Sequence, residues 1–457
     1  MADPSYDRTL RRNYRLTVLN GVFIMTAFAF VSPSIILTGF VYKLTGSNVW
    51  VGLVSAILGA GWLWPQIFMS NIVEHRERKK PFYWIPGILR VCGWASITAV
   101  TFVLGSGDPH RLFVAFLVLF TLYSSAGGIS MLPWIDIVGK IIPLEQRARL
   151  FGNRRFWGGT LGILAGVLVK YILSDRSGLM FPYNYGALFG LATVFVAASV
   201  VAFLLVDEPI EPVSGQRRPF RQHMASGPRL LRHDPDYRKY LVARSLWSLA
   251  MMGVPFYVPY AMSRLGAAEH MMGLFLSVTM VSSVLSNLVW RRIGGRSSRI
   301  ILEWGVALVM VAPLLAVLVP HLPGGQGTIL SSSTMDGGSV LDMRTLCLFL
   351  VFVVNGAGLA GINLASMTYL LEIAPSRIRP TYIGFMNTFS FPLTFVPVLT
   401  GFLIQRVSYE PLFIAAALFG LMGVLVVRRL TEEGVSDEKE AELEQRINGV
   451  EDVKRET

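Results

Sequence analysis

Charge is scarce in this sequence of 457 residues: Asp, Glu, Lys and Arg make up 15%, whereas hydrophobic residues make up 53%. A single soluble core of this length could not bury so much apolar surface. Many apolar runs also reach the roughly 20 residues that a helix needs to cross about 30 Å of hydrocarbon. Isolated strands cannot satisfy their backbone in lipid, so we expect an all-α integral membrane protein.

Cysteine and catalytic motifs are scarce as well. Cys92 and Cys347 lie far apart in apolar runs, where we expect small buried hydrophobic residues rather than a disulfide. No metal-binding His/Cys spacing, nucleophile elbow, phosphate-binding loop or dinucleotide fingerprint occurs in the sequence. We therefore expect no enzyme activity, no metal, no cofactor and no ATP hydrolysis by this chain.

Breaks at proline, glycine and charge clusters divide the apolar sequence into about twelve expected spans. The first span follows a basic segment and is too long for the core of a cleaved signal peptide. The expected spans cover residues 16–40, 49–72, 83–105, 112–138, 153–174 and 184–206 in the first half, and 239–262, 270–290, 300–320, 344–372, 380–405 and 410–428 in the second.

Polar segments set the expected domain boundaries. The spans form two six-helix units, at 16–206 and 239–429, and a basic N-terminus at 1–15 precedes them. Residues 207–238 form a linker that is rich in Pro and Arg and too polar to span a membrane. Residues 430–457 form an acidic tail with few apolar residues.

Basic residues are distributed unevenly between the two sides of the expected membrane. The side that carries the N-terminus has 28 Lys and Arg residues, and the opposite side has 7. Positive loops stay in the cytoplasm, so we expect both termini there, with the protein in the plasma membrane. The net charge of +12 then reflects membrane topology. A nucleic-acid partner would require a folded basic domain, and the sequence shows none, so we expect no such partner.

Two pairs of segments indicate an internal repeat. "PLEQRARLFG" (143–152) and "PSRIRPTYIG" (375–384) align Pro, Arg and Gly at a constant offset of 232. "YRLTVLN" from Tyr14 matches "YRKYLVA" from Tyr237 at an offset of 223. Two such halves of six spans, each starting and ending on the same side, are parallel repeats related by an axis along the membrane normal.

With this organisation the chain resembles the major facilitator superfamily of transporters over nearly its whole length apart from the tail. The superfamily's loop between spans 2 and 3 usually reads Gly-x-x-x-Asp-Arg-x-Gly-Arg-Arg/Lys. Here "SNIVEHRERKK" (70–80) keeps the basic end from Arg78, and "NLVWRRIGGR" (287–296) keeps Arg292 and Gly294. The resemblance implies two bundles rocking about a midplane site, and a loop ion pair in which Glu74 replaces the usual Asp.

Charged groups at the ends of the spans are candidates for contacts that form in one conformer and break in the other. Asp136 and Glu372 lie at the ends of spans 4 and 10, where the negative helix terminus disfavours a carboxylate, so each should seek a cation such as Arg147 or Arg379. An open alternative is that both are ordinary interfacial carboxylates in contact with water. The candidates for conformational control are Glu74, Arg78, Asp136, Arg147, Gly152, Arg292, Gly294, Glu372, Arg379 and Gly384.

The centres of the expected spans lack Asp, Glu, Lys and His, which predicts a largely neutral cavity. We expect Arg90 and Arg244 to snorkel to the cytoplasmic surface, with binding of a substrate carboxylate as the alternative. In the resembled superfamily, spans 1, 4, 7 and 10 line the cavity with help from spans 2, 5, 8 and 11. The candidate cavity residues, for each of which helix packing is the alternative role, are Phe28, Trp62, Trp64, Gln66, Tyr123, Ser125, Trp247, Asn355, Asn363 and Asn387.

Spans 5 and 11 differ in their small and rigid residues. Gly158, Gly162 and Gly166 recur every four residues on span 5 and predict close approach of a neighbouring helix. Pro392 and Pro397 on span 11 permit bending. Span 5 lacks the Gly-Pro pair of the superfamily's antiporter signature.

The expected function is secondary transport of a neutral or amphiphilic small molecule by a monomer in contact with membrane lipid. Export of hydrophobic compounds and uptake of a sugar or similar metabolite are both open. Coupling to a proton through Asp136 or Glu372 and uniport are open too. The alternatives from other classes are an assembly factor that does not transport, and a lipid-acting enzyme built on Asp136, Glu74 and His75.

Overall fold

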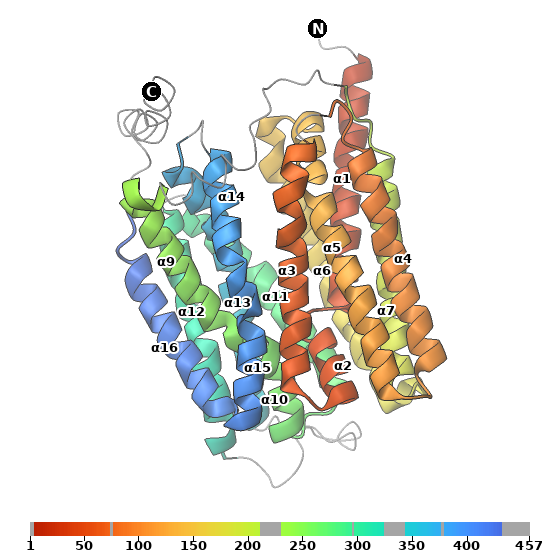
Figure 1. Ribbon diagram of the computed structural model, residues 1–457, viewed down its shortest axis with the longest axis vertical. Coiled ribbons are helices and arrows are strands. Elements are labelled where there is room, and N and C mark those ends of the chain that lie inside the picture. The colour runs from red at the N-terminus through yellow and green to blue at the C-terminus, as the bar shows by residue number, and fades with distance from the viewer. Residues whose placement is uncertain are drawn as a thin grey trace, which may run out of the picture.

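The computed structural model describes residues 4–73, 76–210, 230–294, 297–323, 343–375 and 379–431, and the regular structure in these ranges is helical (Figure 1). The linker residues 211–229 and the tail residues 432–457 lie outside the described residues. In the first half the helices are α1 (Pro4–Phe30), α2 (Ile36–Thr45), α3 (Asn48–Val73), α4 (Pro81–Leu104), α5 (Pro109–Ile141), α6 (Leu144–Ile172) and α7 (Tyr183–Leu204).

The second half repeats this series with more interruptions. The second half has the short 3-10 turns η2 (Met251–Phe256), η3 (Val319–His321) and η5 (Pro392–Phe395), whereas the first half has η1 (Asp175–Ser177) between α6 and α7. The helices of the second half are α9 (Pro235–Ala250), α10 (Tyr257–Arg264), α11 (Met271–Gly294), α12 (Ser298–Leu318), α13 (Met343–Ile373), α14 (Arg379–Ser390), α15 (Val396–Arg406) and α16 (Tyr409–Val427).

Helix starts follow local capping chemistry. The side chain of Asp108 accepts the backbone N–H of His110 before α5, and that of Asp234 accepts two N–H groups at the start of α9. Proline occupies the first turn of both helices, where its missing N–H has no cost. These caps satisfy backbone donors that the first helical turn leaves unpaired.

Three expected spans are divided into two helices each. The first breaks between α1 and α2 around Pro33, and the seventh breaks through η2 at Pro255. The eleventh breaks through η5 at Pro392. Proline removes an N–H and crowds the preceding turn, so it allows each span to change direction. The predicted bend of span 11 is therefore present.

Ten segments in the described residues are long and apolar enough to cross a membrane. The sequence predicted about twelve spans. The two that are not among these ten are the first, formed by α1 and α2, and the fifth, formed by α6. The N-terminal turns of α1 carry several arginines, and its apolar part continues beyond the break into the short α2. The N-terminal turns of α6 also carry charge, from Glu145 to Arg155.

The helices pack as two bundles whose internal contacts match (Figure 1), except that α6 packs extensively on α1 whereas its counterpart α14 meets α9 only slightly. In the first, α1 packs on α7, α3 on α5, and α4 on both α5 and α7. In the second, α9 packs on α16, α11 on α13, and α12 on both α13 and α16. Contacts of α6 with α11 and of α3 with α15 join the two bundles. These pairings are those that the internal repeat predicts.

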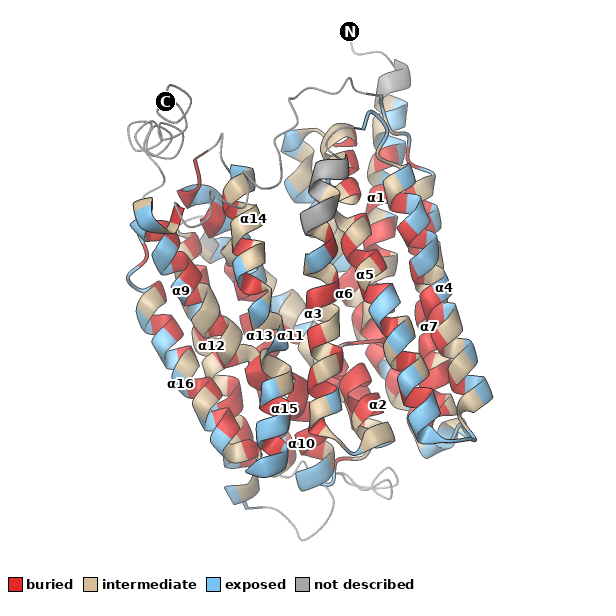
Figure 2. Cartoon of the chain, in the orientation of Figure 1, coloured by how far each residue is buried: buried red, intermediate tan, exposed pale blue. Residues whose placement is uncertain are grey.

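Large hydrophobic side chains also cover the outside of the molecule. Leu89 and Val103 of α4 and Leu421 of α16 are among many exposed apolar residues, and exposed positions run along the outer helices in Figure 2. A soluble monomer rarely exposes apolar surface on this scale. The surface suits contact with lipid chains.

Candidate functional site

The two ends of the molecule differ in how the bundles meet. We call the end where α1 begins and α16 ends the terminal end, and the opposite one the distal end (Figure 1). One continuous cluster of buried hydrophobic residues joins both bundles toward the distal end, from Phe40 and Val51 to Phe275 and Phe413. At the terminal end each bundle has a cluster of its own.

Polar contacts close the distal end. Gln405 Nε2 donates to Ser47 Oγ at 2.7 Å, and the Tyr409 hydroxyl donates to Asn48 Oδ1 at 3.0 Å. Lys43 forms an ion pair with Glu269 across the bundles. Every hydrogen bond or ion pair recorded between described residues of opposite bundles lies in the distal half or near mid-length.

Close backbone approach supports the same closure. A Cβ on Gly273 of α11 would lie 2.2 Å from the backbone nitrogen of Lys170 on α6. A Cβ on Gly52 of α3 would lie 2.1 Å from the carbonyl oxygen of Pro397 on α15. Only glycine fits at either position without movement of the neighbouring helix. The predicted glycine face of α6 takes part, since Gly166 packs against Gly273.

Comparison with known proteins gives the family. The sequence profile described as Major Facilitator Superfamily matches residues 16–343 and 265–455. The chain belongs to the Major Facilitator Superfamily. It is therefore a secondary transporter with no enzymatic function, and an integral membrane protein with several spans. No curated protein sequence matches the chain.

Several solved transporter structures share the fold of this chain at low sequence identity. The nucleoside transporter NupG has a TM-score of 0.61 at 14% identity, over 91% of this chain and 98% of that one. A POT family transporter in complex with 5-aminolevulinic acid has a TM-score of 0.65 at 13% sequence identity, over 92% of this chain and 95% of that one. A bacterial homologue of the iron transporter ferroportin, in an inward-facing state, has a TM-score of 0.67 at 11% sequence identity, over 92% of this chain and 98% of that one.

The two repeated loops of this superfamily member bind their own helix ends. Arg147 Nε donates to the carbonyl of Ile142 at 3.0 Å, and its Nη2 donates to that of Gly139 at 2.6 Å. Arg379 Nε donates to the carbonyl of Ala374 at 3.1 Å. The arginines thus cap the ends of α5 and α13, and neither contacts the carboxylate that the sequence suggested.

Those carboxylates have other partners. Asp136 Oδ2 accepts from Lys79 Nζ at 3.0 Å, and Glu372 accepts from the hydroxyl of Ser298 at the start of α12. Asp136 thus ties the loop before α4 to the end of α5 within one bundle. This arrangement differs from the expected pairing with Arg147, because that guanidinium is already occupied by carbonyl groups.

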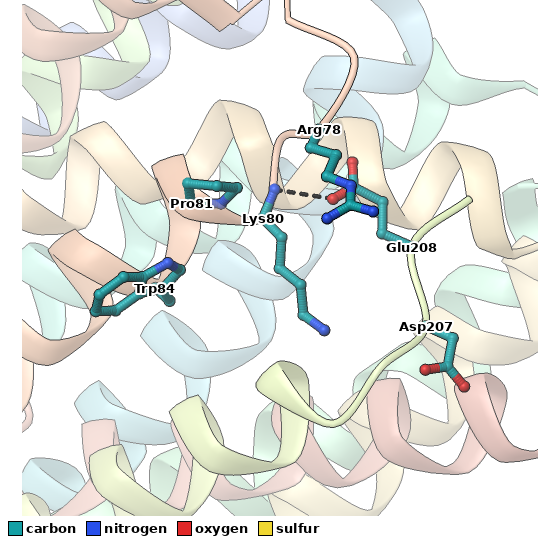
Figure 3. Close-up of a pocket in the computed structure, with 6 residues that line it drawn as sticks. All are labelled: Arg78, Lys80, Pro81, Trp84, Asp207 and Glu208. Atoms are coloured by element: carbon teal, nitrogen blue, oxygen red, sulfur yellow. Dashed lines mark hydrogen bonds between the residues drawn. The ribbon is translucent and has the colours of Figure 1, made fainter. Parts of the chain in front are cut away.

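A buried ion pair reinforces the loop before α4. Glu208 accepts the backbone N–H groups of Lys79 and Lys80, at 2.8 and 2.9 Å, and lies 3.5 Å from Lys140 Nζ. Glu208 and Lys80, whose hydrogen bond is marked in Figure 3, line a pocket together with Arg78, Pro81, Trp84 and Asp207. The volume of this pocket is about 310 Å³. Sequence reasoning missed Glu208, because it was assigned to the linker.

The remaining candidates for conformational control show no contact between bundles in the described residues. Gly152 lies within α6 and has open space around it, so close packing does not require glycine there. Arg292 is exposed in the last turn of α11, and Gly294 ends that helix. Gly384 lies in α14, where its carbonyl accepts from Thr388. Glu74 and His75 lie outside the described residues.

Five of the predicted cavity residues make pairwise contacts along α3, which contacts Phe28 of α1 and Ser125 of α5. The Phe28 and Trp62 rings are 6.3 Å apart. Trp64 Nε1 donates to Ser125 Oγ at 3.2 Å, and Gln66 donates to the carbonyl of Trp62. Trp62 Nε1 is buried and has no acceptor among the described residues. We call Phe28, Trp62, Trp64, Gln66 and Ser125 the aromatic–amide group.

The other predicted cavity residues do not join this group. Tyr123 is buried inside the first bundle against Trp94, and Trp247 is buried against Tyr240 in the second. On α13, Asn355 is buried and its Oδ1 has no partner in the described part of the chain, whereas Asn363 is exposed. Asn387 on α14 is half-buried.

A buried hub in the first bundle escaped sequence reasoning. Asn20 on α1 donates to the Tyr83 hydroxyl at 3.2 Å and to Ser199 Oγ at 2.9 Å. Its Oδ1 accepts from Trp134 Nε1 at 3.1 Å. One amide therefore connects α1, α4, α5 and α7. The available signal was a single amide within a long apolar run.

The expectation that Arg90 snorkels is wrong. Arg90 is 6% exposed, its guanidinium lies 5.7 Å from the centre of the Tyr123 ring, and its Nε and Nη2 have no hydrogen-bond partner within the described ranges. The buried positions of α4 include Tyr83, Arg90 and Trp94, so Arg90 lies on the face of α4 that packs inside the bundle. From that face its side chain does not reach the surface.

Arg244 behaves differently from Arg90. Its Nε donates to Ser390 Oγ at 2.8 Å, where α9 meets α14. In the first half the equivalent contact is between α1 and α6, and Arg154 of α6 lies there. Its side chain lies against Gly21 of α1, and its guanidinium is 4.3 Å from the centre of the Trp134 ring. Since Gly21 corresponds to Arg244 at the offset of 223, each half has one arginine at this contact, supplied by opposite helices.

Proposed function

We propose that this transporter carries an amphiphilic small organic molecule by alternating access, with both termini in the cytoplasm and the distal end facing outward. The observation that carries the proposal is the asymmetry of the bundle interface. Hydrogen bonds, an ion pair and glycine contacts join the bundles in the distal half, and the terminal end has separate cores. This is the pattern expected of a conformer open to the cytoplasm.

The aromatic–amide group supports the substrate class. Its rings can stack on an apolar or planar part of a molecule, and the Trp62 N–H and the Gln66 amide offer hydrogen-bonding groups. The solved relatives include transporters named for nucleosides and peptides and a homologue of an iron transporter, so they do not favour one substrate class. We propose export as the first candidate direction, with metabolite uptake by the same mechanism as the second candidate.

The carboxylates at the terminal end do not favour proton coupling. Asp136 is held by Lys79, and Glu372 is held by Ser298, at the ends of their helices rather than at mid-length. A relay would need a titratable group near the transport site. We therefore propose a structural role for both carboxylates. We also propose that the protein functions as a monomer in contact with membrane lipid.

A disulfide trap tests alternating access. Ser47→Cys and Gln405→Cys would be introduced into a protein carrying Cys92→Ser and Cys347→Ala. Oxidation should link the two bundles at the distal end and stop transport until the disulfide is reduced. A single-cysteine protein treated in the same way is the control. Transport that continues after complete linkage would contradict alternating access, and a protein that shows no transport before oxidation would favour an assembly factor.

A thermal-shift screen over metabolites and drug-like compounds would identify the substrate. A ligand that binds only the folded state raises its stability by mass action. We expect a selective amphiphilic binder whose effect is lost on Trp62→Ala. Selective stabilisation by sugars alone would favour the uptake candidate.

A further inference from the structure

Arg90 is a buried cation without a counter-charge in the described residues. It is 6% exposed, and both Nε and Nη2 lack a hydrogen-bond partner there. The helices packed on α4 are α5 and α7. Helix α7 contains no Asp or Glu, and the one carboxylate of α5, Asp136, is bound to Lys79 near the terminal end. The helices that surround this guanidinium therefore supply no anion to it.

A second unpaired donor lies one turn further along the same face of α4. Trp94 Nε1 is buried and has no acceptor in the part of the chain that the structure describes. The Trp94 ring lies 5.1 Å from the ring of Tyr123, the same tyrosine that Arg90 faces. Guanidinium and indole groups donate hydrogen bonds and cannot accept them. Their complement is a group that only accepts and carries negative charge.

Such an arrangement is costly for folding alone. An unpaired buried charge destabilises the folded state, and an apolar side chain of similar volume is usually neutral or stabilising in its place. Contact with the Tyr123 ring offsets part of this cost but leaves the N–H groups unpaired. A residue that breaks the rules of a stable core without compensation marks a functional position.

We propose that Arg90 and Trp94 form an oxyanion-binding site inside the first bundle, which takes a carboxylate or phosphate group. The proposal is additional to the transport function above: the anion would bind inside the first bundle, where Tyr123 also lies, and not at the aromatic–amide group. The planar guanidinium can donate two parallel hydrogen bonds to either oxyanion, and the indole N–H adds a third. A free inorganic anion offers the same chemistry, and the experiment separates the two sources.

The first test requires no knowledge of the ligand. Arg90→Met should raise the melting temperature of the purified protein in oxyanion-free buffer, because it removes an unpaired buried charge. Arg244→Met is the matched control and should lower it, because the Arg244 guanidinium has a partner in Ser390. A fall for Arg90→Met as large as that for Arg244→Met would show that Arg90 is structural and would overturn the proposal.

The second test measures binding with defined probes. Sodium benzoate, inorganic phosphate and the neutral benzyl alcohol would be titrated at constant ionic strength while melting temperature is followed. Benzoate should stabilise the wild type and benzyl alcohol should not. Arg90→Gln should weaken this binding at least ~10-fold, and Trp94→Phe should weaken it less, because one N–H is lost.

The outcomes distinguish the sources of the oxyanion. Stabilisation by benzoate but not by phosphate assigns the site to an organic carboxylate, and stabilisation by phosphate assigns it to a phosphate group or the free anion. Stabilisation by neither salt, or an effect that survives Arg90→Gln, would overturn the proposal. The disulfide trap at Ser47 and Gln405 is independent of Arg90, so failure here leaves alternating access intact.

Discussion

Arg147 and Arg379 lie 232 residues apart and cap the preceding helix in the same way. The Nε of each arginine donates to the carbonyl oxygen five residues earlier, at 3.0 Å and 3.1 Å. Carbonyl groups at a helix end carry partial negative charge and lack partners within the helix. The repeat therefore preserves a physical function as well as a sequence pattern.

Removal of this cap should destabilise the first bundle. Arg147→Ala loses the bonds to Ile142 and Gly139, and we expect a loss of about 1–3 kcal/mol, because charged donors make strong hydrogen bonds. The neighbouring Arg149 is exposed, so Arg149→Ala is the control. Thermal unfolding in one detergent would compare the two variants. Equal effects would mean that Arg147 acts only through its net charge.

The two ion pairs near the start of α4 should differ in strength. Glu208→Gln removes the only carboxylate recorded against the Lys140 ammonium within the described residues. That ammonium keeps its bond to the Glu77 carbonyl, and we expect a loss of about 3 kcal/mol. Asp136→Asn breaks a pair whose carboxylate is 43% exposed, so a loss below about 1 kcal/mol is expected. Unfolding measurements would rank them. If Asp136→Asn proved the more damaging variant, the assigned roles would be reversed.

Closure of the distal end should depend on Gly273. A Cβ there meets the backbone of Lys170, so Gly273→Ala should separate α6 from α11 and reduce disulfide formation between cysteines at Ser47 and Gln405. Gly152→Ala on α6 has open space and should leave the rate unchanged. The ratio of crosslinking rates is the readout. Efficient crosslinking in both variants would contradict the close contact.

Two tryptophans should separate binding from stability. Trp64 is 43% exposed in the aromatic–amide group, so Trp64→Ala should weaken ligand-induced stabilisation at little cost to the melting temperature. Trp247 is 3% exposed, and Trp247→Ala should cost about 3–5 kcal/mol through a large cavity. A similar loss of stability in both variants would place Trp64 in the packing core instead.

Much of the fold could be predicted from local pattern. Apolar runs of sufficient length predicted the helices, and the repeated loops predicted two equivalent bundles. Pro392 predicted the break in span 11. The matching breaks at Pro33 and Pro255 escaped notice, because each proline lies inside an apolar run that is long enough to be read as one continuous span.

The site was less predictable because it depends on faces and distant contacts. Arg90 was assigned by its distance from the helix end, whereas its place on the buried face of α4 decides its surroundings. The pair of Lys43 and Glu269 joins residues 226 positions apart in one conformer, and no local pattern indicates it. Tyr123 and Trp247 were identified by type, but both rings face the interior of a bundle.

The central claim is that the two ends open in alternation. Spin labels at Ser47 and Gln405 would report the distal end, and labels at Arg149 and Arg292, both exposed, would report the terminal end. The measurement is the pair of distance distributions by electron–electron resonance, with and without a stabilising ligand. The account predicts opposite changes, with one distance growing as the other shrinks. Distances that stay fixed at both ends, or that grow together, would contradict it.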